Sequence, residues 1–174
     1  MKAPTNSHPG YAATSTNSGP TYNEYLKVPD LLKLQQPLSE PPHHDEMLFI
    51  LIHQAYELWF KLILHELEVA RDLLMQGQVL RSHHFLKRSV EVMRLLVQQI
   101  HILETMKPID FLQFRDRLNP ASGFQSIQFR ELEFLAGAKD ERMLHHFKSQ
   151  PQVIEILTKR LNETDLRVAF YTAC

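Results

Sequence analysis

The feature that most constrains the fold is an apolar pattern that runs from residue 45 to residue 76. Its side chains recur every three or four positions, as one face of an amphipathic helix requires. They are Leu48, Leu51, Ile52, Ala55, Leu58, Trp59, Leu62, Ile63, Leu67, Ala70 and Leu74. Asp45 and Glu46 stand where a helix dipole favours acids, and Gly77 supplies a stop. At about 1.5 Å per residue this helix is roughly 45 Å long, so it needs a long partner.

The next segment supplies that partner. The same spacing recurs in Phe85, Ser89, Val92, Met93, Leu96, Val97, Ile100 and Leu103. Pro108 is predicted to end this second long helix, which runs antiparallel to the first. A short helix is expected over residues 109–118, and Ser122 with Gln125 forms a capping box that is predicted to open a helix up to Gly137. No alternating strand pattern occurs, so we predict an all-α helical bundle.

The first part of the chain has a different composition. Residues 1–20 are rich in Pro, Ser, Thr, Asn and Gly, which predicts a disordered tail ahead of a helical domain over 21–174. Apolar residues at helical spacing over 22–34 predict a short helix that Pro29 breaks. Three prolines over 35–42 predict an extended connection.

Charge and composition exclude several classes of function. The formal net charge is -1, so no broad field attracts a polyanion, and we expect neither nucleic-acid nor membrane binding. No apolar run reaches the roughly 18 to 20 uncharged residues of a membrane span. The single cysteine, Cys174, excludes an internal disulfide, and with no secretory signal this favours a cytoplasmic location.

Ten histidines are the compositional oddity, but none predicts a metal site. Six form adjacent pairs whose side chains diverge on a helix: His43–His44, His83–His84 and His145–His146. Glu40 and His43 match the E-x-x-H spacing of di-iron bundles, but they lie in a proline-bearing segment without a second copy. Cys174 has no structural reason to be an activated nucleophile.

One aromatic stripe on the first long helix is a candidate binding site. Its members, at intervals of four, three and four, are Phe49, His53, Tyr56 and Phe60. His53 is the strongly polar member, and two interpretations stay open. It is either a neutral core histidine bonded to a backbone carbonyl, or a pocket histidine that faces a planar ligand between aromatic walls.

A second candidate is Arg115, which projects with Phe111 four residues earlier. The planar guanidinium matches a carboxylate with two parallel hydrogen bonds. The alternative is a surface arginine paired with Asp116 or Glu104.

Two blocks of this sequence resemble the signature of the tryptophan 2,3-dioxygenase family, haem enzymes that open the indole ring. The first is PHHDEMLFILIHQAYELWFK at 42–61, and the second joins ILETM at 102–106 to FLQFRDRLNPASGFQSIQFR at 111–130. The likeness runs from about Tyr22 to about Leu144. It implies an oxidoreductase of tryptophan catabolism, the kynurenine pathway, that uses haem iron to convert L-tryptophan and dioxygen to N-formylkynurenine as a homotetramer.

The resemblance also implies residue roles. His53 would be the catalytic histidine that accepts a hydrogen bond from the indole N–H, with Phe49 beside the indole. Arg115 would bind the substrate carboxylate, and Phe111 would form a wall. The run implied to bind substrate on the first long helix is Phe49, Ile50, Leu51, Ile52 and His53.

Two further sets follow from the resemblance. Ser122 and Gly123 match a turn that lies against the haem. Tyr22, Tyr25 and Leu26 match a segment that reaches into a neighbouring subunit's pocket. From the residues alone, the tyrosine pair is typical of a docking face or of a ligand wall.

The match covers only the N-terminal half of the family pattern, because family members continue into a second half that carries the proximal haem histidine. We therefore expect this chain alone to hold haem weakly and to be inactive. It would be a truncated product, a fragment, or one half of a split enzyme completed by a separate chain. The alternative is a non-catalytic helical interaction module that oligomerises with or regulates a full-length relative. Its long apolar helices predict oligomerisation in either case.

Overall fold

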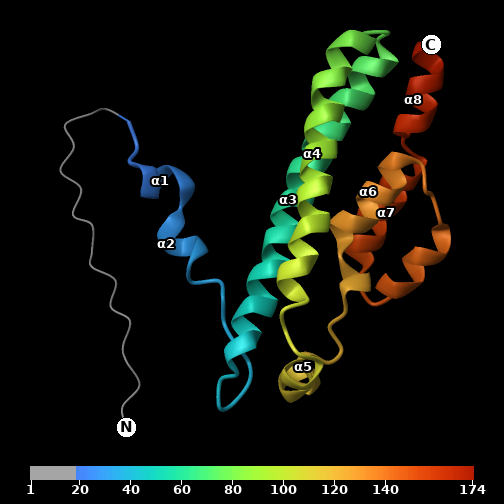
Figure 1. The fold of residues 1–174 in the computed structure, drawn as a ribbon. Coiled ribbons are helices and arrows are strands. Elements are labelled where there is room, and N and C mark those ends of the chain that lie inside the picture. The colour runs from blue at the N-terminus through green and yellow to red at the C-terminus, as the bar shows by residue number, and fades with distance from the viewer. Residues whose placement is uncertain (1–18) are drawn as a thin grey trace. The chain divides into compact units, whose positions relative to one another are not determined.

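A computed structural model describes residues 19–174 of the chain, and these fall into two compact units that divide after Gln36. The predicted disordered tail over 1–20 lies almost wholly outside the described residues. Within those that are described, every regular element is helical (Figure 1), and the all-α prediction is confirmed.

The first unit holds two short helices, α1 (Tyr22–Leu26) and α2 (Val28–Leu31). The predicted broken helix is therefore found, but the break is not at the proline. It lies at Lys27, whose backbone is left-handed with φ 53°. Pro29 instead sits in the first turn of α2, where a missing N–H costs no intrahelical hydrogen bond.

The second unit is built on α3 (His44–Met75) and α4 (Val79–Leu103), which run antiparallel side by side (Figure 1). Gly77 turns the chain between them with φ 71°, a conformation that a side chain disfavours. Both long helices were predicted from periodicity. The predicted end of the second at Pro108 is wrong, because α4 stops at Leu103.

The early end of α4 has a local cause. The Thr105 hydroxyl donates to the Ile102 carbonyl at 2.6 Å, and its backbone N–H donates to the same oxygen at 3.2 Å. These i to i−3 bonds compete with the helical pattern and tighten the last turn. The chain then leaves the helix before it reaches Pro108.

The segment after Pro108 folds as α5 (Pro108–Arg115), which continues into the 3-10 turn η1 (Asp116–Leu118). The short helix predicted over 109–118 is therefore present, with its last turn tighter than α-helical.

The Ser122–Gln125 capping box is also present, but it opens a different element. It begins the 3-10 turn η2 (Gly123–Gln125) instead of the long helix. A second cap, Ser126, accepts the Phe129 N–H at 3.1 Å and begins α6 (Ile127–Ala136). Gly137 ends α6 as predicted, with φ 103°.

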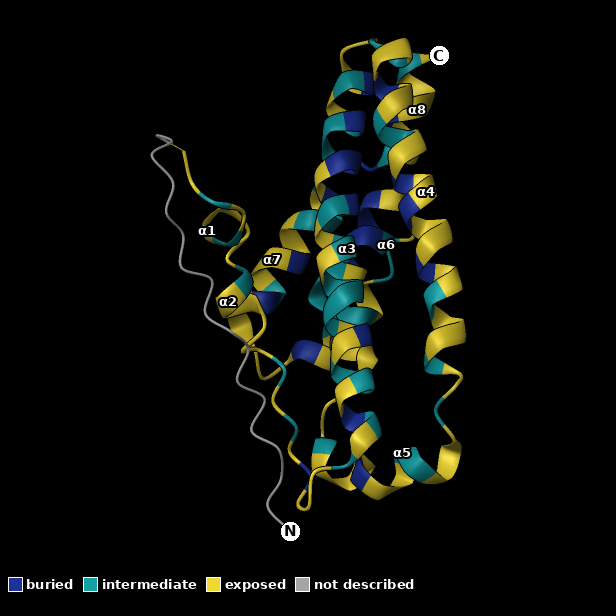
Figure 2. Cartoon of the chain, turned by 60° about the vertical axis from the view of Figure 1, so that its left-hand side comes forward, coloured by how far each residue is buried: buried dark blue, intermediate teal, exposed yellow. Residues whose placement is uncertain are grey.

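The remaining elements are η3 (Glu141–Phe147), α7 (Pro151–Asn162) and α8 (Leu166–Ala173). Buried residues, dark blue in Figure 2, lie where α3 faces α4 and α6. One core cluster there comprises Ile63, Leu64, Leu67, Val92, Leu96, Leu132 and Leu135. A second, between α6, η3 and α7, comprises Phe134, Phe147, Val153 and Leu157.

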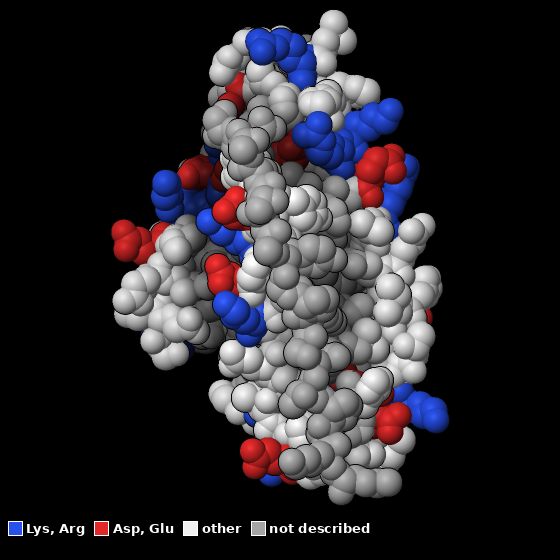
Figure 3. All heavy atoms as spheres, turned by 90° about the vertical axis from the view of Figure 1, so that its left-hand side faces the viewer, with Lys and Arg blue, Asp and Glu red and all other residues white. Residues whose placement is uncertain are grey.

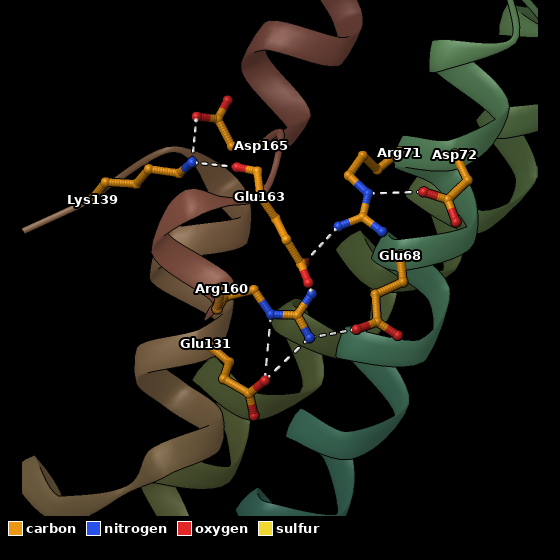
Figure 4. A network of polar contacts seen from close by, with 8 residues as sticks. All are labelled: Glu68, Arg71, Asp72, Glu131, Lys139, Arg160, Glu163 and Asp165. Atoms are coloured by element: carbon orange, nitrogen blue, oxygen red, sulfur yellow. Dashed lines mark hydrogen bonds and ion pairs between the residues drawn. The ribbon is translucent and has the colours of Figure 1, made fainter. Parts of the chain in front are cut away.

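A network of charges also joins these elements (Figure 4). Arg160 of α7 pairs with Glu68 of α3 and with Glu131 of α6, the latter at 3.1 Å. Glu163 lies 2.8 Å from Arg160 and 3.0 Å from Arg71 of α3. Burial lowers the pKa of Arg160, but the hydrogen bonds that it donates to Glu68 and Glu131 outweigh this effect and raise that pKa above its ordinary value. The network thus fastens α7 to the C-terminal half of α3.

Helix α3 is unusually apolar. By length and composition alone it qualifies to cross a membrane, with a mean hydropathy of 1.4 over an 18-residue window. From the sequence, no stretch was expected to qualify, because that expectation considered only unbroken apolar runs. His53 and Gln54 interrupt such a run, but the mean hydropathy of the window remains high enough to qualify. The core helix of a soluble protein meets the same criterion but is mostly buried, whereas 17% of this window is buried within the chain. On the face in Figure 3, acidic and basic side chains are intermingled.

Large apolar side chains remain exposed on α4. Leu80 is 93% exposed and Val97 is 66% exposed, while Met93 and Ile100 are exposed to a lesser degree. The uncovered apolar faces expected from the sequence are therefore present, and the oligomerisation drawn from them stays a prediction.

Candidate functional site

The candidate site lies at the end of the bundle where α3 begins and α5 packs against it (Figure 1). His43 caps α3, because its Nδ1 accepts the Asp45 N–H at 3.2 Å. Its ring lies 5.6 Å from the ring of Phe114 in α5. The first turns of α3 are therefore fixed against α5, which brings together side chains that are more than fifty residues apart in sequence.

Three phenylalanines form the wall of this site. The rings of Phe49 and Phe111 stack with centroids 5.6 Å apart and planes 27° apart. Phe114 is fully buried and meets both rings edge-on, at 5.8 Å from Phe49 and 5.5 Å from Phe111. Aromatic rings prefer such edge-to-face contacts, so Phe114 favours one relative orientation of the Phe49 and Phe111 rings. The result is a half-exposed aromatic surface supported from below by Phe114.

His53 lies on the exposed side of this wall. Its Nδ1 is 2.7 Å from the Phe49 carbonyl, and its ring centroid is 4.1 Å from that of Phe49. Because a carbonyl oxygen only accepts, Nδ1 carries the proton, and Nε2 of the neutral ring is an acceptor. The interpretation of His53 as a core histidine predicted a hydrogen bond to a backbone carbonyl and a buried ring. The hydrogen bond is present, but the His53 side chain is exposed.

Arg115 extends from α5 along the same surface. Its guanidinium carbon lies 5.5 Å from the centroid of the Phe111 ring, a cation–π distance. Within residues 19–174 no ion pair involves Arg115, so the predicted surface pair with Asp116 or Glu104 is not found. Glu104 instead bonds His101 at 2.9 Å. The exposed guanidinium can donate to a carboxylate.

The neighbouring residues of α3 do not all share this surface. Ile52 is 6% exposed and packs inside the chain, whereas Leu51 is 45% exposed. Two residues along a helix correspond to a rotation of about 200°, so Leu51 points away from both Phe49 and His53. Ile50 is half-buried. Leu51 therefore faces away from the aromatic wall, and the roles of Ile50, Leu51 and Ile52 in substrate binding stay predictions.

The remaining predicted residues belong to other segments of the chain. Ser122 and Gly123 form an exposed turn, and a side chain added at Gly123 would meet nothing within 4 Å. Tyr22, Tyr25 and Leu26 belong to the first unit, where all three side chains are exposed. Their roles in binding stay predictions.

Sequence reasoning missed a buried carboxylate at the base of the site. Glu46 is fully buried and accepts the backbone N–H groups of Leu38 at 2.6 Å and Ser39 at 3.0 Å, together with the Ser39 hydroxyl. Burial raises its pKa, but these hydrogen bonds outweigh that effect and lower the pKa below its ordinary value. Only the spacing could have indicated this role: Glu46 precedes Phe49 by three residues and His53 by seven, so it lies on the same face of the helix.

Phe114 was missed as well. Its spacing of three from Phe111 placed it on a neighbouring face of α5, but a single sequence does not distinguish an exposed aromatic from a buried one. Among residues 19–174 no group of three or more His, Cys, Asp or Glu side chains is suited to a metal ion.

Fold and surface together define a class: a helical bundle whose exposed aromatic face carries one hydrogen-bond acceptor and one free guanidinium. Such a face suits a planar ligand that bears a donor and a carboxylate.

Comparison with known proteins narrows the class to a family. The profile of tryptophan 2,3-dioxygenase matches residues 6–169. The chain is 53% identical over 155 residues to a tryptophan 2,3-dioxygenase from Nocardioides sp., covering 86% of this chain and 58% of the relative. It is 47% identical over 150 residues to one from Herpetosiphon aurantiacus, covering 86% and 57%. A third, from Xanthomonas oryzae pv. oryzae, is 50% identical over 132 residues, covering 76% and 44%.

This chain therefore belongs to the tryptophan 2,3-dioxygenase family. It spans about half the length of the curated relatives it matches.

Proposed function

We propose that this chain supplies the substrate-recognition half of a haem-dependent dioxygenase that opens the indole ring of L-tryptophan to N-formylkynurenine. Membership of the family supports this proposal. The observation that carries it is the placement of His53 and Arg115 on one aromatic surface, with His53 against Phe49 and Arg115 over Phe111. A zwitterionic indole requires this combination: an apolar wall, one acceptor and one guanidinium.

In this proposal the indole packs on the Phe49–Phe111 wall. The indole N–H donates to Nε2 of His53, which is the free acceptor because Nδ1 is bonded to the Phe49 carbonyl. The carboxylate accepts two hydrogen bonds from Arg115. Since the indole N–H is a weak acid, His53 orients the ring and does not act as an essential base.

By the family resemblance, the exposed turn at Ser122 and Gly123 is the part of this chain that would face a haem. The open turn at Gly123 leaves room for a flat group, and the adjacent Phe124 ring is 66% exposed and stacked 6.2 Å from the ring of His146. Ser122, Gly123 and Phe124 would hold the haem, whose iron would supply dioxygen activation.

The test is selective loss of carboxylate recognition. Arg115→Ala should weaken the binding of L-tryptophan by roughly ten- to a hundredfold, because a charged hydrogen-bonded contact contributes about 1.5 to 3 kcal/mol. Affinity for tryptamine, which lacks the carboxylate, should hardly change. Arg117→Ala is the matched control, since Arg117 is an exposed arginine in the adjoining turn. Equal losses for both ligands would refute the assignment.

A second candidate is the non-catalytic interaction module, with which the exposed apolar side chains of α4 are also compatible. Sedimentation at micromolar concentration distinguishes a monomer from the dimers or tetramers that both proposals expect. A haem titration followed by absorbance then separates the two candidates. The dioxygenase half predicts a change in the haem spectrum, whereas the interaction module requires none.

A further inference from the structure

We propose that Glu46 is a positioning residue for the tryptophan site, acting through Ser39, His43 and Phe114. The inference rests on the proposed function for its substrate. Its structural part, the linkage from a buried carboxylate to the α5 wall, stands on the contacts of this chain alone.

The first step of the linkage is a chain of hydrogen bonds. Glu46 accepts from the backbone N–H and the hydroxyl of Ser39. The same hydroxyl oxygen accepts the backbone N–H of His43 at 2.8 Å. Glu46 therefore holds the extended segment before α3 in place, and that segment holds His43.

The second step is packing. The His43 ring covers one side of Phe114, with centroids 5.6 Å apart. Phe114 is fully buried and contacts Phe49 and Phe111 with its other sides. Because close-packed interiors transmit small displacements, a shift of His43 alters the seat of Phe114. Phe111, and Arg115 one turn later, then move with α5.

The third observation is the location of the carboxylate itself. Glu46, Phe49 and His53 occupy positions i, i+3 and i+7 of α3, so they lie along one face of the helix. A carboxylate this deeply buried is retained only where hydrogen bonds replace its hydration. Here those donors all come from Leu38 and Ser39, in a segment that carries no part of the aromatic wall.

Two variants and a control test the linkage. Glu46→Gln places an amide NH2 group against the N–H donors of Leu38 or Ser39, so at least one bond is lost. Ser39→Ala keeps Glu46 ionised but removes the hydroxyl shared with His43. Glu40→Gln is the control, because Glu40 is an exposed glutamate in the same segment.

The first readout is structural and needs no substrate: the aromatic NMR signals of Phe111 and Phe114 and the side-chain Nε–H signal of Arg115. We expect these signals to shift in Glu46→Gln and Ser39→Ala, with the helical circular dichroism unchanged, and to stay in place in Glu40→Gln. The second readout is ligand preference. The affinity for L-tryptophan should fall by about tenfold relative to tryptamine, as partial loss of the Arg115 contact requires.

The outcomes separate this inference from the proposed function. If the unaltered chain binds no L-tryptophan, the proposed function fails, while the NMR signals still decide whether Glu46 positions α5. Unmoved signals in folded Glu46→Gln and Ser39→Ala would overturn the inference. Unfolding of both variants would also overturn it, since Glu46 would then be a folding element and not a positioning residue.

Discussion

The two ends of helix α3 lie in different surroundings. Around Glu68 and Arg71, aliphatic clusters and the Arg160 network connect α3 to α4, α6 and α7. Around Phe49 and His53, the partners are aromatic rings, and polar groups are left exposed. A bundle of this kind can place a binding surface at one end because stability is concentrated at the other.

The largest expected effect is at the structural end. Arg160→Met leaves Glu68, Glu131 and Glu163 without their shared cation, in a site where Arg160 is 12% exposed. Because the network is only part-buried, removing its shared cation should cost about 3 kcal/mol of unfolding free energy, the lower end of the range for buried pairs. Urea denaturation at pH 7 measures it. Arg142→Met is the control, since Arg142 pairs with Asp140 at the surface and its removal should leave the midpoint unchanged.

The next effect is pH-dependent and lies beneath the site. Burial raises the pKa of Glu46, but hydrogen bonds from Leu38 and Ser39 lower it on balance below its ordinary value of 4.5. Its stabilisation is therefore fully present above pH 4.5 and is lost as pH falls through the lowered pKa. At pH 7, Glu46→Gln should cost about 1.5 to 3 kcal/mol.

The pH series supplies the check on Glu46. The difference in unfolding free energy between the wild type and Glu46→Gln should shrink on acidification. A difference that is constant from pH 7 to pH 3 would show that the charge of Glu46 contributes nothing.

A smaller effect comes from the middle of the aromatic stripe. The Tyr56 hydroxyl donates to the Leu96 carbonyl of α4, and burial raises the pKa of this phenol above its ordinary value. Tyr56→Phe should lower the unfolding free energy by about 1 kcal/mol, the contribution of one neutral hydrogen bond. L-tryptophan affinity should stay the same. A loss of affinity without a loss of stability would extend the binding surface toward Tyr56.

The smallest effect on stability is expected at His53, one turn before Tyr56 on the same stripe. Its ring bonds only within its own helix, and Ala is the better helix former, so His53→Ala should change the unfolding free energy by less than about 0.5 kcal/mol. L-tryptophan affinity should fall by roughly two- to tenfold, as one neutral hydrogen bond predicts. Marked destabilisation would instead favour a structural histidine.

The sequence predicted the long helices well because their periodicity extends over many turns. It misplaced boundaries that local hydrogen bonds decide: Thr105 ends α4 early, Ser126 begins α6 late, and Lys27 and not Pro29 breaks the first helical segment. Each of these depends on a single backbone or hydroxyl contact, which spacing does not encode.

The site was predicted as two separate pairs. Phe49 with His53, and Phe111 with Arg115, follow from spacing within one helix. That the pairs meet depends on tertiary packing through Phe114. The buried state of Glu46 depends on backbone N–H groups of Leu38 and Ser39, which every non-proline residue possesses and no pattern marks.

The comparison between the two ends of α3 is tested most directly by locating bound tryptophan on the protein. Besides the aromatic surface, the other end of the bundle has an apolar groove of about 290 Å³ between α3, α4, α6 and α8, lined in part by Leu74, Phe170 and Tyr171. L-tryptophan titrated into isotope-labelled protein should shift NMR signals of Phe49, His53, Phe111 and Arg115, and leave those of the groove unchanged. Shifts confined to Leu74, Phe170 and Tyr171 would contradict the assignment of binding to the first turns of α3.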